Sequence, residues 1–211
     1  MSDITIQSAE ESDIPDLIAL NLENHIENLT LEEANQFGFL ILIYSEDLLR
    51  RMMQVEPFIV AKAEGKIVGY LYPMPNSYRS IPGVSHRFED MDRLTFEGRS
   101  MREINYIKLG SACIAKDYKG KGVFKMLYDE MKRRYVDAYE IVLTRVFESN
   151  GRSLAGHMKL GFIPFAQGSQ KCLAESHIKC GGSAMMGKDT ELDCKGNWNW
   201  LYIKWREQGL C

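Results

Sequence analysis

Positive charge is lacking at the start of this 211-residue chain. Residues 1–49 hold eleven Asp or Glu and no Lys or Arg, whereas residues 116–134 hold seven Lys or Arg against three acids. This asymmetry predicts a negative surface and a positive one on the same molecule, although a solvated acidic helix face explains the first stretch equally well. No stretch is basic enough to indicate nucleic-acid binding.

Long apolar runs and an even set of cysteines are lacking too. The longest apolar run, Phe37 to Tyr44, is far too short to cross a membrane, and the first residues lack the pattern of a signal peptide. Five cysteines are an odd number, which argues against a closed disulfide framework. With 45% apolar and 26% charged residues, the sequence predicts one globular domain over 1–211, in the reduced cytoplasm and without a membrane partner.

Apolar periodicity and capping residues predict an alternation of strands and helices. Asp13 is placed to cap the first helix, and Ser45 is placed to cap a third one. Between them, Thr30 and Glu33 have the spacing of a capping box. The predicted strands are 4–7, 58–63, 66–71, 106–115, 141–147, 163–166 and 198–205, and the later helices are 123–135 and 152–160. This order predicts an α/β (α+β) domain with a central mixed, twisted β-sheet flanked by helices.

Two segments show no regular periodicity. Residues 73–101 contain three prolines and two glycines, and they predict an elaborated loop before the fourth strand. A loop of that length in a compact domain is usually functional or mobile. Residues 167–197 predict an irregular C-terminal segment, and the strand 198–205 is interpreted as an edge strand that would pair across a homodimer.

A basic turn punctuated by glycine follows the predicted strand 106–115. Gly120 and Gly122 permit close approach of the backbone to a ligand, and the next helix adds the positive end of its dipole. The turn therefore predicts a phosphate or diphosphate site, with an ordinary solubilising turn as the alternative. Lys121 is followed by glycine rather than Ser or Thr, and Lys125 stands where a dinucleotide fingerprint needs a small residue, which disfavours both standard nucleotide motifs.

Two motifs resemble those of the GCN5-related N-acetyltransferase (GNAT) superfamily. The acyl-CoA motif of that family is Arg/Gln-x-x-Gly-x-Gly/Ala; here Lys119 keeps the charge of its first residue and Gly122 matches its glycine. Phe124 stands where a small residue is usual. The second motif, an Asn followed by a helix and Gly-Phe, matches Asn150 to Phe162. The resemblance covers roughly residues 4–165.

The resemblance implies an acyl-CoA N-acyltransferase with acetyl-CoA as co-substrate. It implies that pantetheine pairs with the backbone of Cys113, Ile114 and Ala115, that the diphosphate binds the amides of Lys119, Gly120, Lys121, Gly122, Val123 and Phe124, and that Asn150 binds CoA from the opposite side. A helix cap explains Asn150 as well. The acceptor would be a small-molecule or peptide amine, and the acidic N-terminal helices favour a cationic one. The alternative is a catalytically silent CoA-binding sensor or adaptor.

The chemistry implied is direct attack of a neutral amine on the thioester, which needs a base and an acid. His157 occupies the position of a tyrosine that often acts as the acid in the family, and the alternative is a helix-surface histidine. Tyr128 and Tyr106 are other candidate donors. Glu103, just before the fourth strand, is the candidate base, with a strand-end charge or a water chain as alternatives.

Two further clusters carry open hypotheses. Glu89, Asp90 and Asp92 are candidates for holding a cationic acceptor. Four soft ligands occur at irregular spacing near the C-terminus, without a close Cys-x-x-Cys pair, so no metal is predicted. These four residues are Cys172, His177, Cys180 and Cys194.

Overall fold

The computed structural model describes residues 3–169 and 197–204. Its main sheet has seven strands in the order β1-β2-β3-β6-β7-β9-β8, and every neighbouring pair is antiparallel except β6 and β7. The strands are β1 (Ile4–Ser8), β2 (Ile59–Ala63), β3 (Lys66–Met74), β6 (Tyr106–Ile114), β7 (Ile141–Phe147), β8 (Ile163–Ser169) and β9 (Asn197–Ile203). A separate hairpin joins β4 (Thr95–Phe96) to β5 (Arg99–Ser100).

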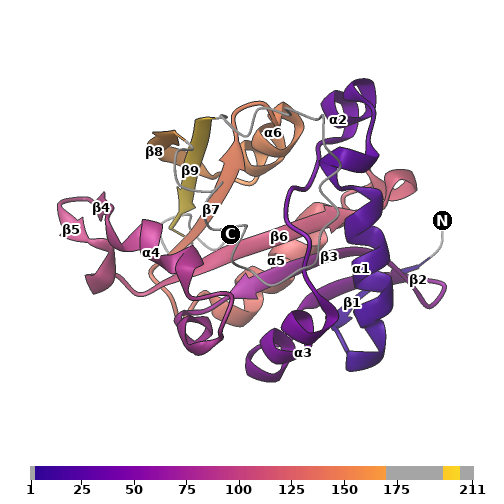
Figure 1. Ribbon diagram of the computed structural model, residues 1–211, viewed down its shortest axis with the longest axis horizontal. Helices are drawn as coiled ribbons and strands as arrows, with labels where there is room; N and C mark the ends of the chain where they lie inside the picture. The colour runs from indigo at the N-terminus through magenta and orange to yellow at the C-terminus, as the bar shows by residue number, and fades with distance from the viewer. Residues whose placement is uncertain (1–2, 170–196, 205–211) are drawn as a thin grey trace.

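Helices cover both faces of this sheet (Figure 1). They are α1 (Ile14–Glu23), α2 (Leu31–Phe37), α3 (Glu46–Val55), α4 (His86–Asp92), α5 (Val123–Tyr135) and α6 (Gly151–Lys159). Successive side chains of a strand point to opposite faces, so Tyr70 and Tyr106 pack with α1 while Leu71 and Ile107 pack with α5. The predicted mixed sheet flanked by helices is confirmed.

The first half of the chain shows which capping predictions were right. Thr30 and Glu33 form the capping box of α2, and the Ser45 hydroxyl caps α3, as predicted. Asp13 does not cap α1. Its carboxylate instead accepts hydrogen bonds from Lys62 Nζ at 2.6 Å and from the Glu10 amide at 2.9 Å, because the chain turns sharply just before α1.

The segment 73–101 differs from the irregular loop that its prolines suggested. It contains the end of β3, a 3-10 helix (Asn76–Ser80), α4 and the β4–β5 hairpin. Tyr78, Val84 and Phe88 are fully buried in the core that α1 and α3 cover. These elements are too short for periodicity to reveal, and burial of their apolar residues holds them in place.

The last strand also differs from its prediction. β9 lies between β7 and β8, so it is an internal strand, and β8 is the outermost of the described strands on that side. Hydrogen bonding on both sides leaves β9 no free edge through which to pair across a homodimer. The prediction of an edge at 198–205 was therefore wrong. The sequence did not reveal this arrangement because both neighbours of β9 are distant in the chain.

Candidate functional site

The central opening of the sheet lies between β6 and β7. The two strands pair in parallel over only three residues, Tyr106–Lys108 with Ile141–Leu143. After this paired stretch Thr144 Oγ1 still donates to the Leu109 carbonyl at 3.4 Å. The described residues of β6 and β7 that follow do not pair with each other. On its other side β6 stays paired with β3, with a shift of register between Leu71 and Pro73. One edge of β6 is therefore left for a ligand.

A pocket of about 540 Å³ occupies this opening. Its walls come from residues 37–44, α4, β6, the start of α5, β7 and α6. Among the residues that the structure describes, no Asp or Glu lines it. Its charged lining consists of Arg87, Lys108, Lys119, Lys125, Arg145, Arg152 and Lys159. Such a pocket favours an extended ligand with negative charge.

The start of α5 forms one end of the pocket, which we call the amide end (residues 120–125). Gly120 and Gly122 have φ values of +79° and +83°, a region that disfavours any other residue. No side chain caps α5, so the amides of its first turn lack that partner and are suited to an anion. The space beside both glycines is open. A diphosphate fits this end.

Most of the residues expected to bind the co-substrate lie together at this pocket. Cys113, Ile114, Lys119, Gly120, Gly122, Val123, Phe124 and Asn150 line it. Ala115 and Lys121 are not part of the lining. The Ala115 amide donates to the Val68 carbonyl at 2.9 Å, and Lys121 Nζ lies over the Tyr118 ring.

The surroundings of two of these lining residues, Cys113 and Lys119, shift their pKa values. Burial raises the pKa of the Cys113 thiol to about 12, so the sulfur is protonated at neutral pH and is no nucleophile. Lys119 Nζ donates to Asn24 Oδ1 at 2.8 Å and to the Phe37 carbonyl at 3.2 Å. Burial lowers the pKa of Lys119. Its ammonium therefore ties the turn before α5 to the segment after α2.

Asn150 does cap a helix, as the alternative interpretation had it. Its Oδ1 accepts from the Ser153 amide at 3.2 Å at the start of α6. Its Nδ2 donates to the Phe39 carbonyl at 2.9 Å. The side chain thus joins α6 to the wall made by residues 37–44, and α2 and α6 lie side by side in Figure 1. A contact between Asn150 and CoA stays a prediction.

His157 is buried in α6 rather than exposed on its surface, so the helix-surface alternative was wrong. Its ring lies edge-on to Phe124 and Phe162, with centroids 5.1 and 5.2 Å away. Nδ1 lies 2.8 Å from the Ser153 carbonyl, so Nδ1 carries the proton and Nε2 is an acceptor. Burial lowers the pKa of His157 to about 4. The neutral ring is poorly suited to proton donation at neutral pH.

The other proton-transfer candidates do not line the pocket. Glu103 ends a 3-10 helix (Met101–Glu103), and its carbonyl accepts from Arg99. The Tyr106 hydroxyl accepts from Arg79 Nη2 at 2.9 Å, and burial raises the Tyr106 pKa to about 12. Tyr128 packs in the α5 core. The structure therefore brings none of the three to the pocket.

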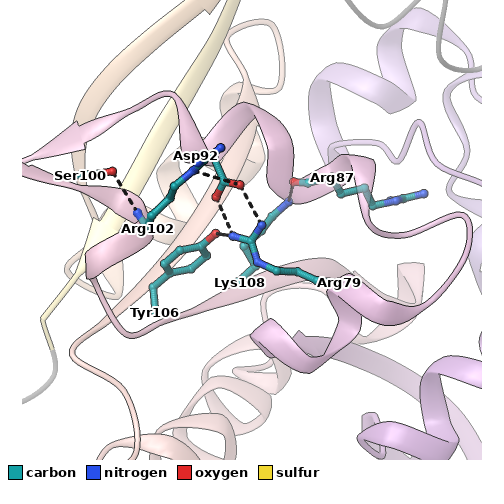
Figure 2. Close-up of polar contacts among 7 residues, drawn as sticks. All are labelled: Arg79, Arg87, Asp92, Ser100, Arg102, Tyr106 and Lys108. Atoms are coloured by element: carbon teal, nitrogen blue, oxygen red, sulfur yellow. Dashed lines mark hydrogen bonds and ion pairs between the residues drawn. The ribbon is translucent and has the colours of Figure 1, made fainter.

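Two members of the predicted acidic cluster, Glu89 and Asp92, do not line this pocket, and the side chain of the third, Asp90, lies outside what the structure describes. The Asp92 carboxylate accepts from Arg79 Nη1 at 3.0 Å and Nη2 at 2.7 Å, as Figure 2 shows. Glu89 is exposed and does not line the pocket. Carboxylates of the N-terminal stretch pair with later cations, for example Glu33 with Lys116. This arrangement gives no support to a cationic acceptor.

Four pocket residues linked by hydrogen bonds were missed by the sequence analysis: Tyr44, Arg87, Lys108 and Ser111. The Tyr44 hydroxyl lies 3.2 Å from Ser111 Oγ and accepts from Arg87 Nη1 at 3.0 Å. Lys108 is 7% exposed, and its Nζ donates to the Arg87 carbonyl at 2.8 Å. We call Arg87 and Lys108 the cationic end of the pocket. A lysine within an apolar strand was the signal that could have pointed there.

The metal candidates Cys172, His177, Cys180 and Cys194 lie outside the described residues. Within 3–169 and 197–204, no group of three or more His, Cys, Asp or Glu is placed to hold a metal ion. No helix in the same ranges is long and apolar enough to cross a membrane.

The mixed sheet with a diverging strand pair and an uncapped helix at one end defines a pocket for an extended, anionic co-substrate. A model of the acetyltransferase (GNAT) family matches residues 25–162, and the chain belongs to this family. The resemblance seen in its motifs is thereby confirmed. None of the curated proteins compared with the chain matches it.

Solved structures show the same fold. An N-acetyltransferase from Staphylococcus aureus Mu50 is 13% identical with a TM-score of 0.60, over 96% of this chain and 99% of that one. The ribosomal-protein-S18-alanine N-acetyltransferase from Escherichia coli is 13% identical with a TM-score of 0.57, over 96% and 94%. A GNAT phosphinothricin acetyltransferase from Sinorhizobium meliloti, in complex with AcCoA, is 16% identical with a TM-score of 0.58, over 97% and 89%. At these identities the similarity shows the fold alone.

Proposed function

We propose that this protein transfers the acetyl group of acetyl-CoA to an amine acceptor. The observation that carries the proposal is the early separation of β6 from β7, with the uncapped start of α5 at the end of the opening. A solved structure of the same fold holds AcCoA, which supports acetyl-CoA as the co-substrate.

The residues around the opening suit the parts of acetyl-CoA. Pantetheine is rich in amide groups and would pair with the free edge of β6 at Cys113 and Ile114. The diphosphate would bind the amides of the turn between Lys119 and Phe124. The Phe124 ring lies beside Gly156 and His157, so it is turned toward α6 and leaves its own amide available.

The reaction proposed is direct attack of the amine nitrogen on the thioester carbonyl carbon. The new C–N bond forms, the C–S bond breaks, the amine loses a proton and the CoA thiolate gains one. The amine proton leaves to water in this proposal, because no described carboxylate lines the pocket and Glu103 lies outside it. The neutral His157 ring packs the pocket wall rather than donating that proton.

Two measurements test this function. Calorimetric titration with acetyl-CoA and with CoA should show saturable binding at one site. Detection of released thiol with a panel of amines should then show turnover that depends on the acceptor. Absence of acetyl-CoA binding would contradict the proposal at its first step.

A silent CoA-binding sensor is the second candidate. Phe124 in place of a small residue and the neutral, buried His157 favour it. Tight acetyl-CoA binding without thiol release from any amine would support the sensor and contradict the enzyme.

A further inference from the structure

We propose that Lys119 is a positioning residue for the co-substrate. With Asn150, it holds residues 37–39 across the opening between β6 and β7 and so sets the width of the space for the pantetheine arm. We call residues 37–39 the crossing segment. This inference rests on the proposed function, because it explains how this chain shapes its acetyl-CoA site. In it the Lys119 ammonium acts through the protein backbone and does not contact the diphosphate.

Lys119 binds the crossing segment from the β6 side of the opening. The residue lies in the turn that follows β6, and its side chain is half-buried. Its Nζ donates to the Phe37 carbonyl at 3.2 Å and to Asn24 Oδ1 at 2.8 Å, and it lies 5.3 Å from the centre of the Phe37 ring. An ammonium has three donors, so most of its bonding capacity is used on α1 and the end of α2.

Asn150 binds the same segment from the β7 side. It follows the end of β7, at the start of α6. Its Nδ2 donates to the Phe39 carbonyl at 2.9 Å, while its Oδ1 accepts from the Ser153 amide. The Phe39 ring also lies beside the ring of Phe147, the last residue of β7, with centroids 6.2 Å apart. Both sides of the opening are therefore bonded to one short stretch of backbone.

Gly38, between the two bonded carbonyls, permits a close crossing. Its φ is +75°, and a Cβ there would lie 2.9 Å from Asn150 Oδ1 and 3.6 Å from Arg152 Cβ. Moving Asn150 away to make room would break its bond with the Ser153 amide. The crossing segment therefore packs its backbone directly on the start of α6.

The reach of the crossing segment limits the width of the opening. Two residues separate the Phe37 and Phe39 carbonyls, and an extended chain covers at most roughly 7 Å over that length. All three residues of the segment line the pocket. Because β6 and β7 no longer pair at this end, the segment restrains how far Lys119 and Asn150 can move apart. A restrained opening keeps an amide-rich arm against the free edge of β6.

Lys116, in the same turn, provides the contrast. It pairs with the Glu33 carboxylate of α2, and its Nζ lies 5.4 Å from the centre of the Phe37 ring. Its side chain is half exposed, so solvent and salt screen the pair. Its bond ends on a side chain, whereas that of Lys119 ends on a backbone carbonyl of the crossing segment. Lys116 is therefore a matched control of equal charge.

The test measures acetyl-CoA binding to the full chain by calorimetry. Lys119→Met keeps the apolar stem beside Phe37, loses the donors, and should raise the Kd about tenfold. Asn150→Ser keeps a capping oxygen, loses the Phe39 bond, and should raise it about threefold. The double variant should bind only about tenfold more weakly than wild type, because one release already frees the segment; independent contacts would multiply to about thirtyfold. Lys116→Met should change the Kd less than about threefold.

Two further readouts separate positioning from direct contact. A lysine that touched the diphosphate would lose most of its effect in about 0.5 M KCl, whereas the loss in Lys119→Met should persist there. In thiol-release assays with acetyl-CoA, this variant should raise the KM for acetyl-CoA and change kcat less than about threefold. Urea unfolding checks that each variant is folded under the assay conditions.

The outcomes distinguish this inference from the function on which it rests. Losses that multiply in the double variant, or a Lys119→Met loss that disappears in salt, would overturn it and make Lys119 a direct ligand of the diphosphate. An unchanged Kd in Lys119→Met would also overturn it, while binding by the wild-type chain would uphold the co-substrate site. If the wild-type chain binds neither CoA nor acetyl-CoA, the proposed function fails and this inference fails with it.

Discussion

The two ends of the pocket present positive charge in different ways. The amide end is one contiguous stretch whose backbone groups and glycine conformations make the site. The cationic end brings together side chains from α4 and β6, with Tyr44 from the segment before α3 orienting one of them. A group common to every acetyl-CoA molecule suits a backbone site, whereas side chains from separate elements can change to suit one acceptor.

The largest expected effect is at the amide end. Gly122→Asp should weaken acetyl-CoA binding at least roughly a thousandfold, about 4 kcal/mol, because a carboxylate would face the diphosphate. Calorimetry measures the loss. Gly65→Asp in the β2–β3 turn is the matched control, since Gly65 has a φ of +77° and open space beside it. Equal losses in both variants would mean that backbone strain, not the ligand, was measured.

The next effect concerns His157, which lines the pocket from α6. Its pKa of about 4 lies below the ordinary value of 6.5, so the unfolded chain binds a proton that the folded one does not. Stability is therefore full above about pH 6.5 and falls by up to roughly 3 kcal/mol as the pH drops toward 4. Urea unfolding at pH 7.5 and pH 4.5 measures it. His157→Asn should reduce this pH dependence.

The same variant tests proton donation. If His157 packs the wall, His157→Asn should change kcat less than about fivefold at pH 7.5. A hundredfold loss of kcat with an unchanged acetyl-CoA Kd would restore the acid role that its position in the motif suggested.

A smaller effect is expected where α6 meets the segment 37–44. Asn150→Ala removes the cap of α6 and the bond to the Phe39 carbonyl, and should cost about 1–2 kcal/mol of unfolding free energy. Asn150→Ser keeps a capping oxygen and loses only the Phe39 bond. The difference between the two variants in urea unfolding isolates the cap. Indistinguishable variants would mean that the cap contributes nothing measurable.

The smallest effect is expected beside the amide end. Glu33 pairs with Lys116, which lowers the pKa of Glu33 to about 2. Glu33→Gln should strengthen acetyl-CoA binding less than about threefold, because the pair is exposed and screened. Glutamine keeps the capping box of α2. Glu46→Gln on α3 is the control, and an equal change there would point to net charge alone.

Local patterns made much of the fold and of the amide end predictable. The capping box at Thr30 and the cap at Ser45 depend on residues three positions apart, and the glycine turn depends on adjacent residues. Predictions failed where a partner is distant in sequence. Asp13 bonds Lys62 rather than capping α1, and β9 inserts between β7 and β8.

Sequence alone thus determined the family, the order of most elements and the glycine turn at the start of α5, because each is encoded in short-range spacing. Only the tertiary structure decided that Arg87 and Lys108 share one end of the pocket, that His157 is buried and neutral, and that the N-terminal acids do not line the pocket. Charge and burial at a site depend on which distant side chains fold against it. Residue spacing along the chain does not show which side chains those are.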